Sequence, residues 1–135
     1  NQMAKFLQYL YSLLKDIKTY KWGTIGLFAL LCDYSTYNFL LSIIDMDYAK
    51  AASTFVGVNI SFHFNRLWTF QSKAKYFDDL KRYLTLYSLT IAVNVYANKV
   101  SYMILEDINT AYLIALFISV TIGYFGQRLW VFKNR

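Results

Sequence analysis

The sequence predicts an all-α membrane protein, with four transmembrane helices arranged as two repeated helical hairpins. The first observation behind this prediction is composition: the 135 residues are 57% hydrophobic and 16% charged, with no proline. Soluble domains carry roughly 25% charged residues. The second observation is a repeat, because FNRLWTF at 64–70 returns as GQRLWVF at 126–132. Internal repeats of this kind indicate a fold built from similar units.

The repeat extends well beyond this motif. Residues 49–70 align with 111–132 at an offset of 62, which gives 8 identities in 22 positions. Upstream of that segment, an offset of 61 places Lys21 on Arg82 and Asp33 on Asn94. The chain therefore divides into two diverged halves, which run over about 20–70 and 81–132, in parallel orientation.

Each expected span is long and almost free of charge. A helix needs about 20 mostly apolar residues to cross a bilayer. Between Trp22 and Ile44 the single charged residue is Asp33. A soluble bundle of four such helices would retain almost no polar face, so that alternative is disfavoured. Uncharged stretches cover 51–65, 83–98 and 108–127, and the expected transmembrane helices are 21–44, 49–69, 82–105 and 110–131.

The segment before the first span has a different pattern. In residues 3–19, apolar side chains recur at helical spacing with lysines between them. This pattern is typical of an amphipathic helix that lies in the membrane interface. Residues 71–83 form the one candidate linker between the two hairpins. The apolar positions of the first segment are Phe6, Leu7, Leu10, Leu13, Leu14 and Ile17.

Charge placement predicts the orientation of the chain in the cell membrane. Twelve of the 14 lysines and arginines fall in the N-terminal segment, the central connection or the C-terminus. The hairpin loops at 45–47 and 106–110 are acidic instead. Because cytoplasmic loops carry an excess of lysine and arginine, both termini and the central loop are expected in the cytoplasm. The net charge of +6 is then explained by topology and by attraction to anionic membrane lipids, and not by nucleic-acid binding.

The second and fourth spans end in an amide followed by an arginine. These pairs are Asn65–Arg66 and Gln127–Arg128. Paired guanidinium groups beside amides form a candidate phosphate site, because guanidinium matches phosphate oxygens bidentately. The alternative is that both arginines only anchor helix ends at the interface. A stripe of small residues leads to each pair and favours close helix packing: Ser53, Gly57 and Ser61 in one half, and Ala115, Ser119 and Gly123 in the other.

The first and third spans contain polar residues at membrane depth. Asp33 lies in the first span, and Tyr87, Asn94 and Asn98 form a stripe along the third. A carboxylate inside a membrane is costly and indicates function unless a partner explains it. The expected partner of Asp33 is Lys99 or Asn94, and a purely structural polar clasp is the alternative. Turned inward, these residues would form a polar seam that binds a hydroxyl-rich or amide-rich cargo.

Other common site chemistries are absent from the pattern. Cys32 and His63 are each the single residue of their type. They supply neither a metal-ligand set nor a nucleophile–base pair, and no phosphate-binding glycine loop is present. We therefore expect no catalysis by this chain, no metal and no cofactor.

The duplicated closing motif resembles that of the GtrA family. The similarity covers about residues 20–133 and rests on FHFNRLWTF closing the second span and YFGQRLWVF closing the fourth, with a glycine and an aspartate in the first span. The resemblance implies one membrane domain over 1–135. It also implies translocation of a polyprenyl-phosphate-linked monosaccharide for cell-surface polysaccharide, teichoic-acid or O-antigen glycosylation, with a glycosyltransferase as the functional partner. Gln127 departs from the family's asparagine and lengthens the reach of the amide.

Two other function classes fit the same sequence. One is a non-transporting membrane subunit that recruits or stabilises a polyprenyl-phosphate glycosyltransferase. The other is a proton-coupled transporter of the small-multidrug type, which also has four short spans and a membrane carboxylate. The strong charge asymmetry of this chain disfavours the second class, because such proteins often have weak charge bias. The identity of the sugar and the prenyl length stay open, and a homo-oligomer is compatible with the sequence.

The charge asymmetry leads to a topology prediction. Reporters fused at the C-terminus or within 71–80 should report the cytoplasm, and reporters within 45–47 or 106–109 should report the outside. The reason is that lysine and arginine remain on the cytoplasmic side. A mixed signal from any one fusion site would contradict this orientation and favour the drug-transporter class.

Overall fold

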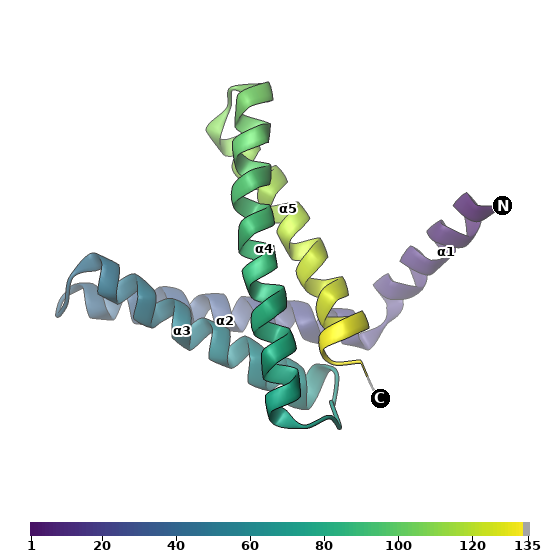
Figure 1. Cartoon of the computed structure of the whole chain (residues 1–135), viewed down its shortest axis with the longest axis horizontal. Helices are drawn as coiled ribbons and strands as arrows, with labels where there is room; N and C mark the ends of the chain where they lie inside the picture. Colours follow the sequence, from purple (N-terminus) through teal and green to yellow (C-terminus); the bar gives the residue numbers. More distant parts are fainter. Residues whose placement is uncertain (134–135) are drawn as a thin grey trace. The chain divides into compact units, whose positions relative to one another are not determined.

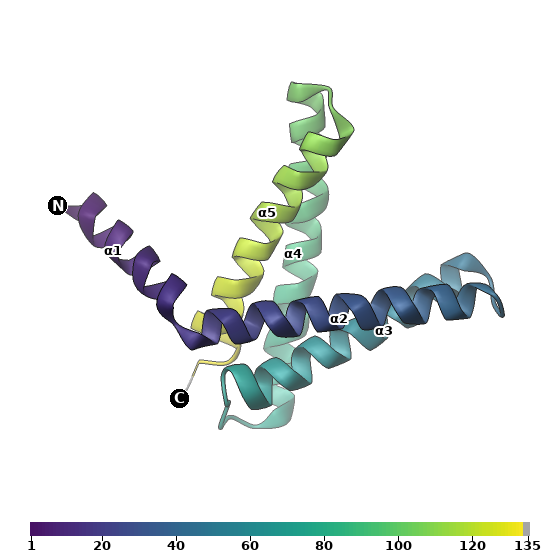
Figure 2. The same cartoon turned by 180° about the vertical axis from the view of Figure 1, so that it is seen from behind.

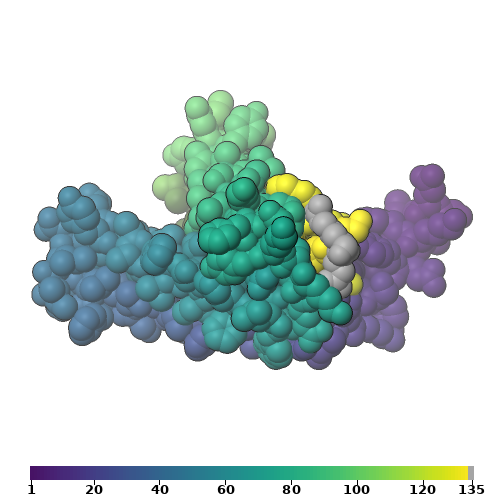
Figure 3. Space-filling model, turned by 60° about the horizontal axis from the view of Figure 1, so that its bottom comes forward, coloured from purple at the N-terminus to yellow at the C-terminus, as the bar shows by residue number. Residues whose placement is uncertain are grey.

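The computed structural model describes residues 1–133 and contains no strand in that range (Figure 1; Figure 3 gives a space-filling view). The all-helical prediction is confirmed. Five α-helices are present, and two of them each continue into one π-helical turn of their own. The elements are α1 (Gln2–Lys15), α2 (Ile17–Leu41), α3 (Met46–Phe64), η1 (Asn65–Thr69), α4 (Tyr76–Leu105), α5 (Ile108–Gly126) and η2 (Gln127–Val131).

The chain divides into two compact units, Asn1–Gln71 and Ser72–Arg135. In the first unit α2 packs along α3 and its π-turn η1, with α1 joined to the start of α2. In the second unit α4 packs along α5 and its π-turn η2. Both views show each pair as an antiparallel hairpin with a short connection at its tip (Figures 1 and 2).

The first helix is shorter than the segment 3–19 that the sequence predicted. It ends at Lys15 because Asp16 separates two helices. The backbone N–H of Asp16 donates to the carbonyl of Leu13, and its carboxylate accepts the N–H of Lys18 at 2.9 Å, which caps the start of α2. A side-chain oxygen that satisfies a free N–H favours a helix start at this point. Residues 17–19 therefore belong to α2.

The predicted linker 71–83 is also shorter in the structure. Helix α4 begins at Tyr76, with Asp78 and Asp79 in its first turn. Carboxylates near a helix N-terminus are favourable because they lie against the positive end of the helix dipole. The connection between the hairpins is thus confined to about 71–75, and Gln71 adopts a left-handed backbone conformation with φ of 47°.

The tip of the second hairpin is held by two acidic residues. Glu106 ends α4 in the left-handed conformation, and its N–H donates to the carbonyl of Tyr102 at 2.8 Å. Asp107 caps α5, with its carboxylate accepting the Thr110 hydroxyl and the N–H of Asn109. The Thr110 hydroxyl, with the backbone N–H groups nearby, lowers the pKa of the Asp107 carboxyl below its ordinary value. The cap is therefore in its charged form at neutral pH.

Small residues form the contact face within each hairpin. Ala49, Ser53 and Gly57 are buried on α3, and Ala111 and Ala115 are buried at equivalent positions on α5. The packing at Gly57 is close: a Cβ atom added there would lie 3.3 Å from Cβ of Asp33 and 3.4 Å from the carbonyl oxygen of Ala29. Small side chains let helix backbones approach each other where lipid provides no hydrophobic drive for association.

Large apolar side chains cover the outside of the hairpins. Leu30 on α2 is 63% exposed and Phe117 on α5 is 74% exposed. Water-soluble proteins rarely expose contiguous apolar surface on this scale. Small residues inside and large apolar residues outside are the arrangement expected where the surroundings are hydrocarbon. Other exposed side chains of this kind are Leu27, Phe28, Leu31, Phe39, Leu84, Leu89, Ile91, Val95, Leu113 and Leu116.

Among the described helices, one passes a test of length and apolarity for a membrane span. It is the 24-residue segment Ile108–Val131, which contains an 18-residue window with a mean hydropathy of 1.7. The remaining predicted spans contain polar residues, such as Asp33 in α2 and Asn94 and Asn98 in α4, that lower their hydropathy. Their lengths are sufficient, since 25 residues of α2 and 30 of α4 extend about 38 and 45 Å at 1.5 Å per residue. The other three spans stay a prediction.

The close approach at Gly57 can be tested by substitution. Gly57→Leu should lower the free energy of unfolding by roughly 1–3 kcal/mol, because overpacking forces the facing backbone apart. The matched control is Gly26→Leu on α2, where an added Cβ meets nothing within 4 Å. That variant should be neutral or slightly stabilising, because leucine is the better helix former. Denaturation of both purified variants in detergent makes the comparison, and equal losses would contradict the packing argument.

Candidate functional site

The repeated sequence motif folds into the same irregular turn twice. At η1 the N–H of Phe70 donates to the carbonyl of Asn65 at 2.9 Å, and at η2 the N–H of Phe132 donates to that of Gln127, also at 2.9 Å. Each bond joins residues five apart, which defines a π-turn. π-Turns within α-helices occur frequently at functional sites. The arginine is the second residue of both turns.

In the first turn both polar atoms of the asparagine side chain are hydrogen-bonded within its own helix. Asn65 is buried, and its side-chain oxygen accepts the Thr69 hydroxyl at 2.8 Å. Its side-chain nitrogen donates to the Ser61 hydroxyl at 3.3 Å. Arg66 follows immediately and is half-buried. The amide of the first copy thus stabilises the turn that presents the arginine.

In the second turn the same network is missing. Gln127 is also buried, but Gly123 and Val131 occupy the positions of Ser61 and Thr69. Neither replacement side chain carries a hydroxyl. The arginine has a partner on its own helix instead, because Arg128 Nη1 donates to the Tyr124 hydroxyl at 2.8 Å. The two copies therefore share backbone geometry and differ in side-chain chemistry.

A neighbouring helix supports each π-turn with a cation. Lys21 of α2 places its ammonium group 5.0 Å from the centre of the Trp68 ring in η1. At the aligned position of the second hairpin, Arg82 Nε donates to the carbonyl of Val131 in η2 at 3.2 Å. Cations near a helix C-terminus satisfy free carbonyls and offset the negative end of the dipole. Both hairpins thus concentrate positive charge at their open end.

Sequence reasoning missed the carboxylate that holds Arg82. The Asp79 side chain is fully buried; it accepts Arg82 Nη2 at 2.9 Å and the Ser72 hydroxyl at 2.6 Å. Both residues lie in the stretch that the sequence assigned to a linker. The available signal was the spacing of an acid three residues before an arginine at the start of a helix, where the two side chains share a face.

Asp33 has its ion pair within its own hairpin. Its carboxylate lies 3.7 Å from the ammonium group of Lys50 on α3. Lys50 also lies 5.5 Å from the centre of the Tyr37 ring. Neither partner considered from the sequence, Lys99 or Asn94, belongs to this hairpin, so a pairing between the two units stays a prediction. The structure adds Lys50, which lies near the hairpin tip.

Asn94 occupies the equivalent place in the second hairpin. Its side-chain nitrogen donates to the Ser119 hydroxyl at 2.7 Å, and that hydroxyl donates to the carbonyl of Ala115. Ser119 aligns with Gly57, as Asn94 aligns with Asp33. Each hairpin therefore places one polar α2 or α4 side chain opposite one small residue of its partner helix. This agreement supports the sequence alignment of the halves.

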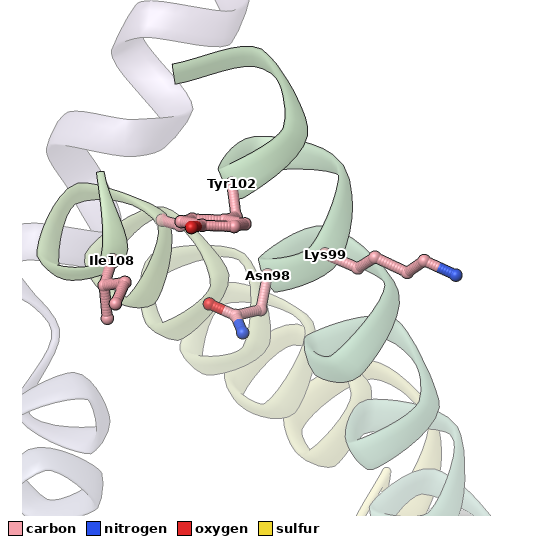
Figure 4. A pocket seen from close by; sticks show the side chains of 5 residues that line it. Asn98, Lys99, Tyr102 and Ile108 are labelled. Atoms are coloured by element: carbon pink, nitrogen blue, oxygen red, sulfur yellow. The ribbon is translucent and has the colours of Figure 1, made fainter. Parts of the chain in front are cut away.

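The other two predicted site residues, Tyr87 and Asn98, lie in different halves of α4. Tyr87 is half-buried near the open end and stacks on Tyr83, with ring centres 6.4 Å apart. Asn98 lies near the tip and lines a pocket of about 370 Å³ with Tyr102 and Ile108. Figure 4 shows the Asn98 amide and the Tyr102 ring toward Ile108, whereas the Lys99 ammonium group points away. Asn98 thus belongs to a largely apolar pocket, separate from the arginine turn.

The helix geometry fixes the spacing between the polar pair and the arginine in each hairpin. Gly57 precedes Arg66 by nine residues on α3 and η1, and Ser119 precedes Arg128 by nine on α5 and η2. Nine residues advance about 14 Å along a helix. This distance is close to half of the roughly 30 Å hydrocarbon thickness of a bilayer. An arginine at the interface would therefore place the polar pair near the middle of the membrane.

A family model described as "GtrA/DPMS, transmembrane domain" matches residues 21–135. The chain belongs to the GtrA/DPMS transmembrane-domain family. The resemblance expected from the closing motifs is confirmed. A comparison with curated proteins gave no match.

Membership of the GtrA/DPMS family establishes the broad setting of the site. The chain is a membrane protein, and its family is associated with the handling of polyprenyl-phosphate sugars and is generally non-catalytic. The matched range contains both hairpins and both arginine turns and leaves out α1. Among the described residues, no group of three histidine, cysteine or acidic side chains is placed to hold a metal ion.

The buried Asp79–Arg82 pair leads to a stability prediction. Arg82→Leu should lower the free energy of unfolding by roughly 1–3 kcal/mol, because a buried carboxylate loses a charged donor. Lys81→Leu, at an exposed neighbouring position, should change it by less than about 0.5 kcal/mol. Removing both partners in Asp79→Leu/Arg82→Leu should recover part of the loss, since no buried charge is then left. Unfolding of the purified variants in detergent checks this, and equal effects of the Arg82 and Lys81 changes would contradict it.

Proposed function

We propose that this chain moves a polyprenyl-phosphate-linked monosaccharide across the cell membrane. The protein spans the membrane four times with both termini in the cytoplasm, and α1 lies along the cytoplasmic membrane surface. The lipid-linked sugar is supplied by a glycosyltransferase partner and serves cell-surface glycosylation. The observation that carries the proposal is the recurrence of one arginine in the same π-turn at the open end of both hairpins.

The arginine turns suit the charged part of this cargo. A polyprenyl-phosphate sugar has one phosphodiester charge, and guanidinium binds phosphate oxygens with two parallel hydrogen bonds. Arg66 and Arg128 are presented by π-turns that other side chains hold in place, Thr69 at η1 and Arg82 at η2. A rigid support lowers the entropy lost on binding. Each arginine can collect the phosphate at the cytoplasmic end of its own hairpin.

The polar pairs suit the passage of the sugar. Moving a sugar through hydrocarbon without partners costs several kcal/mol for each unpaired hydroxyl. Asp33 and Asn94 lie about 14 Å deeper than the arginines by the helix spacing, opposite Gly57 and Ser119. They replace water for the sugar hydroxyls while the isoprenoid tail stays in lipid. Tyr87 near the arginine end and Asn98 near the tip extend the polar path along α4.

The energetics require no chemical fuel. Outward movement of one negative charge runs down a membrane potential that is negative inside, worth about 2.3 kcal/mol per 100 mV. Use of the sugar outside the cell removes the product and favours net export further. Facilitated movement is therefore sufficient, which agrees with the absence of a nucleotide-binding motif in the sequence.

The non-transporting subunit is the competing function. Its support is the apolar outer surface of the hairpins, which suits the packing of another protein's transmembrane helices as well as lipid. Reconstitution of the purified chain without any glycosyltransferase separates the two. A transporter exposes the lipid-linked sugar to an outside reagent under those conditions, whereas a subunit that only supports an enzyme does not.

The arginine turns provide the variants for this assay. Arg66→Lys and Arg128→Lys should reach normal membrane levels, since lysine also places its charge at the interface. Both should slow the exposure of an undecaprenyl-phosphate sugar in vesicles by about tenfold or more, because the planar bidentate contact is lost. Lys133→Arg, at an exposed position, is the control for a change of cation alone. Wild-type rates from both lysine variants would contradict phosphate binding and indicate that the two arginines only anchor helix ends at the interface.

A further inference from the structure

The two amides of the duplicated turn have different hydrogen-bond states. Asn65 is 1% exposed, and both of its polar side-chain atoms have partners on its own helix. Gln127 is 7% exposed, yet its side-chain oxygen accepts no hydrogen bond from any described residue. Buried polar groups in folded proteins are nearly always paired. The Gln127 oxygen is therefore an acceptor for which residues 1–133 supply no donor.

The sequence explains why one copy is satisfied and the other is not. The hydroxyls that serve Asn65 belong to Ser61 and Thr69, four residues on either side. At the equivalent places around Gln127 the chain has Gly123 and Val131. Gln127 thus lacks counterparts of both partners: the Ser61 hydroxyl, which accepts the Asn65 side-chain N–H, and the Thr69 hydroxyl, which donates to the Asn65 oxygen. An amide kept for the fold alone would retain the hydroxyl donor, because a buried unpaired acceptor destabilises the protein.

The vacant acceptor lies one residue before the arginine of the same turn. A phosphate held by Arg128 would leave the group bonded to that phosphate close to residue 127. Glutamine also extends one methylene further from the helix than asparagine does. An amide oxygen binds only a donor, and an ionised phosphodiester has none, whereas every sugar carries several hydroxyl groups.

We propose that the Gln127 side-chain oxygen accepts a hydroxyl group of the sugar whose phosphate Arg128 binds. This assignment rests on the proposed function. The second hairpin then recognises phosphate and sugar together, while the first hairpin recognises phosphate and uses its asparagine to hold the turn. The duplicated motif has diverged into one structural copy and one copy that selects glycosylated lipid over bare polyprenyl phosphate.

The test compares two lipid probes on purified protein at pH 8. One is undecaprenyl-phosphate-glucose, and the other is undecaprenyl phosphate, which at that pH is a dianion without a donor. Gln127→Leu should reduce the preference for the glycosylated lipid by about five- to tenfold, the loss of one hydrogen bond. Val131→Thr should reduce it in the same direction, because it places a hydroxyl where Thr69 serves Asn65. Titrations followed by native mass spectrometry give both dissociation constants.

Thermal stability supplies the second readout. Asn65→Leu should lower the Tm, since Ser61 and Thr69 lose their partner. Gln127→Leu should leave the Tm unchanged or raise it, since a buried acceptor without a donor is removed. A Tm loss for Gln127→Leu together with an unchanged lipid preference would overturn the inference and indicate a structural water at the oxygen. If wild-type protein binds neither lipid, the proposed function itself fails.

Discussion

The close approach of two helix backbones across small side chains is the constraint on which the rest of this structure depends. At Gly57 even a Cβ atom would be in tight contact with the facing helix, 3.3 Å from Asp33 Cβ, and Ser53 and Ala49 continue the same contact. Lipid gives helices no hydrophobic drive to associate, so van der Waals contact and side-chain hydrogen bonds between helices, such as that from Asn94 to Ser119, must supply the driving force. Because the interior of each hairpin is filled by small residues, the large apolar side chains face outward. The polar side chains then have a defined place on the contact face.

Each hairpin ends in a π-turn that continues the helix carrying the small residues, and the arginine is the second residue of that turn. Four groups hold that geometry: Thr69 bonds Asn65 in one copy, and Arg82 bonds the Val131 carbonyl in the other. The arginines are thus part of hydrogen-bonded turns and not of unsupported helix termini. Preorganised cationic groups bind anions at a lower entropic cost than mobile ones.

The sequence predicted the features that repeat and missed those that depend on one neighbour. Helix content, the two halves, and the small stripes through Gly57 and Ser119 all follow from periodicity and alignment. The partner of Asp33 did not, because Lys50 lies near the tip of the predicted hairpin and only the folded structure shows that its ammonium group reaches Asp33. The Asp79–Arg82 pair was hidden in a charged stretch typical of a linker. The π-turns were not predicted. The sequence showed only that the motif at these residues is duplicated.

The position of both ends of a hairpin on one side has a consequence for how a repeat of this kind can arise. Every copy begins and finishes at the same end, with Lys21 beside Trp68 in one and Arg82 beside Val131 in the other. Doubling such a unit within a gene adds an even number of helix passes. The new copy therefore enters the membrane in the orientation of the old one. Its lysines and arginines are then already on the side that this orientation requires. Selection could act at once on single positions, keeping the ancestral role in one copy while the other acquired a new one.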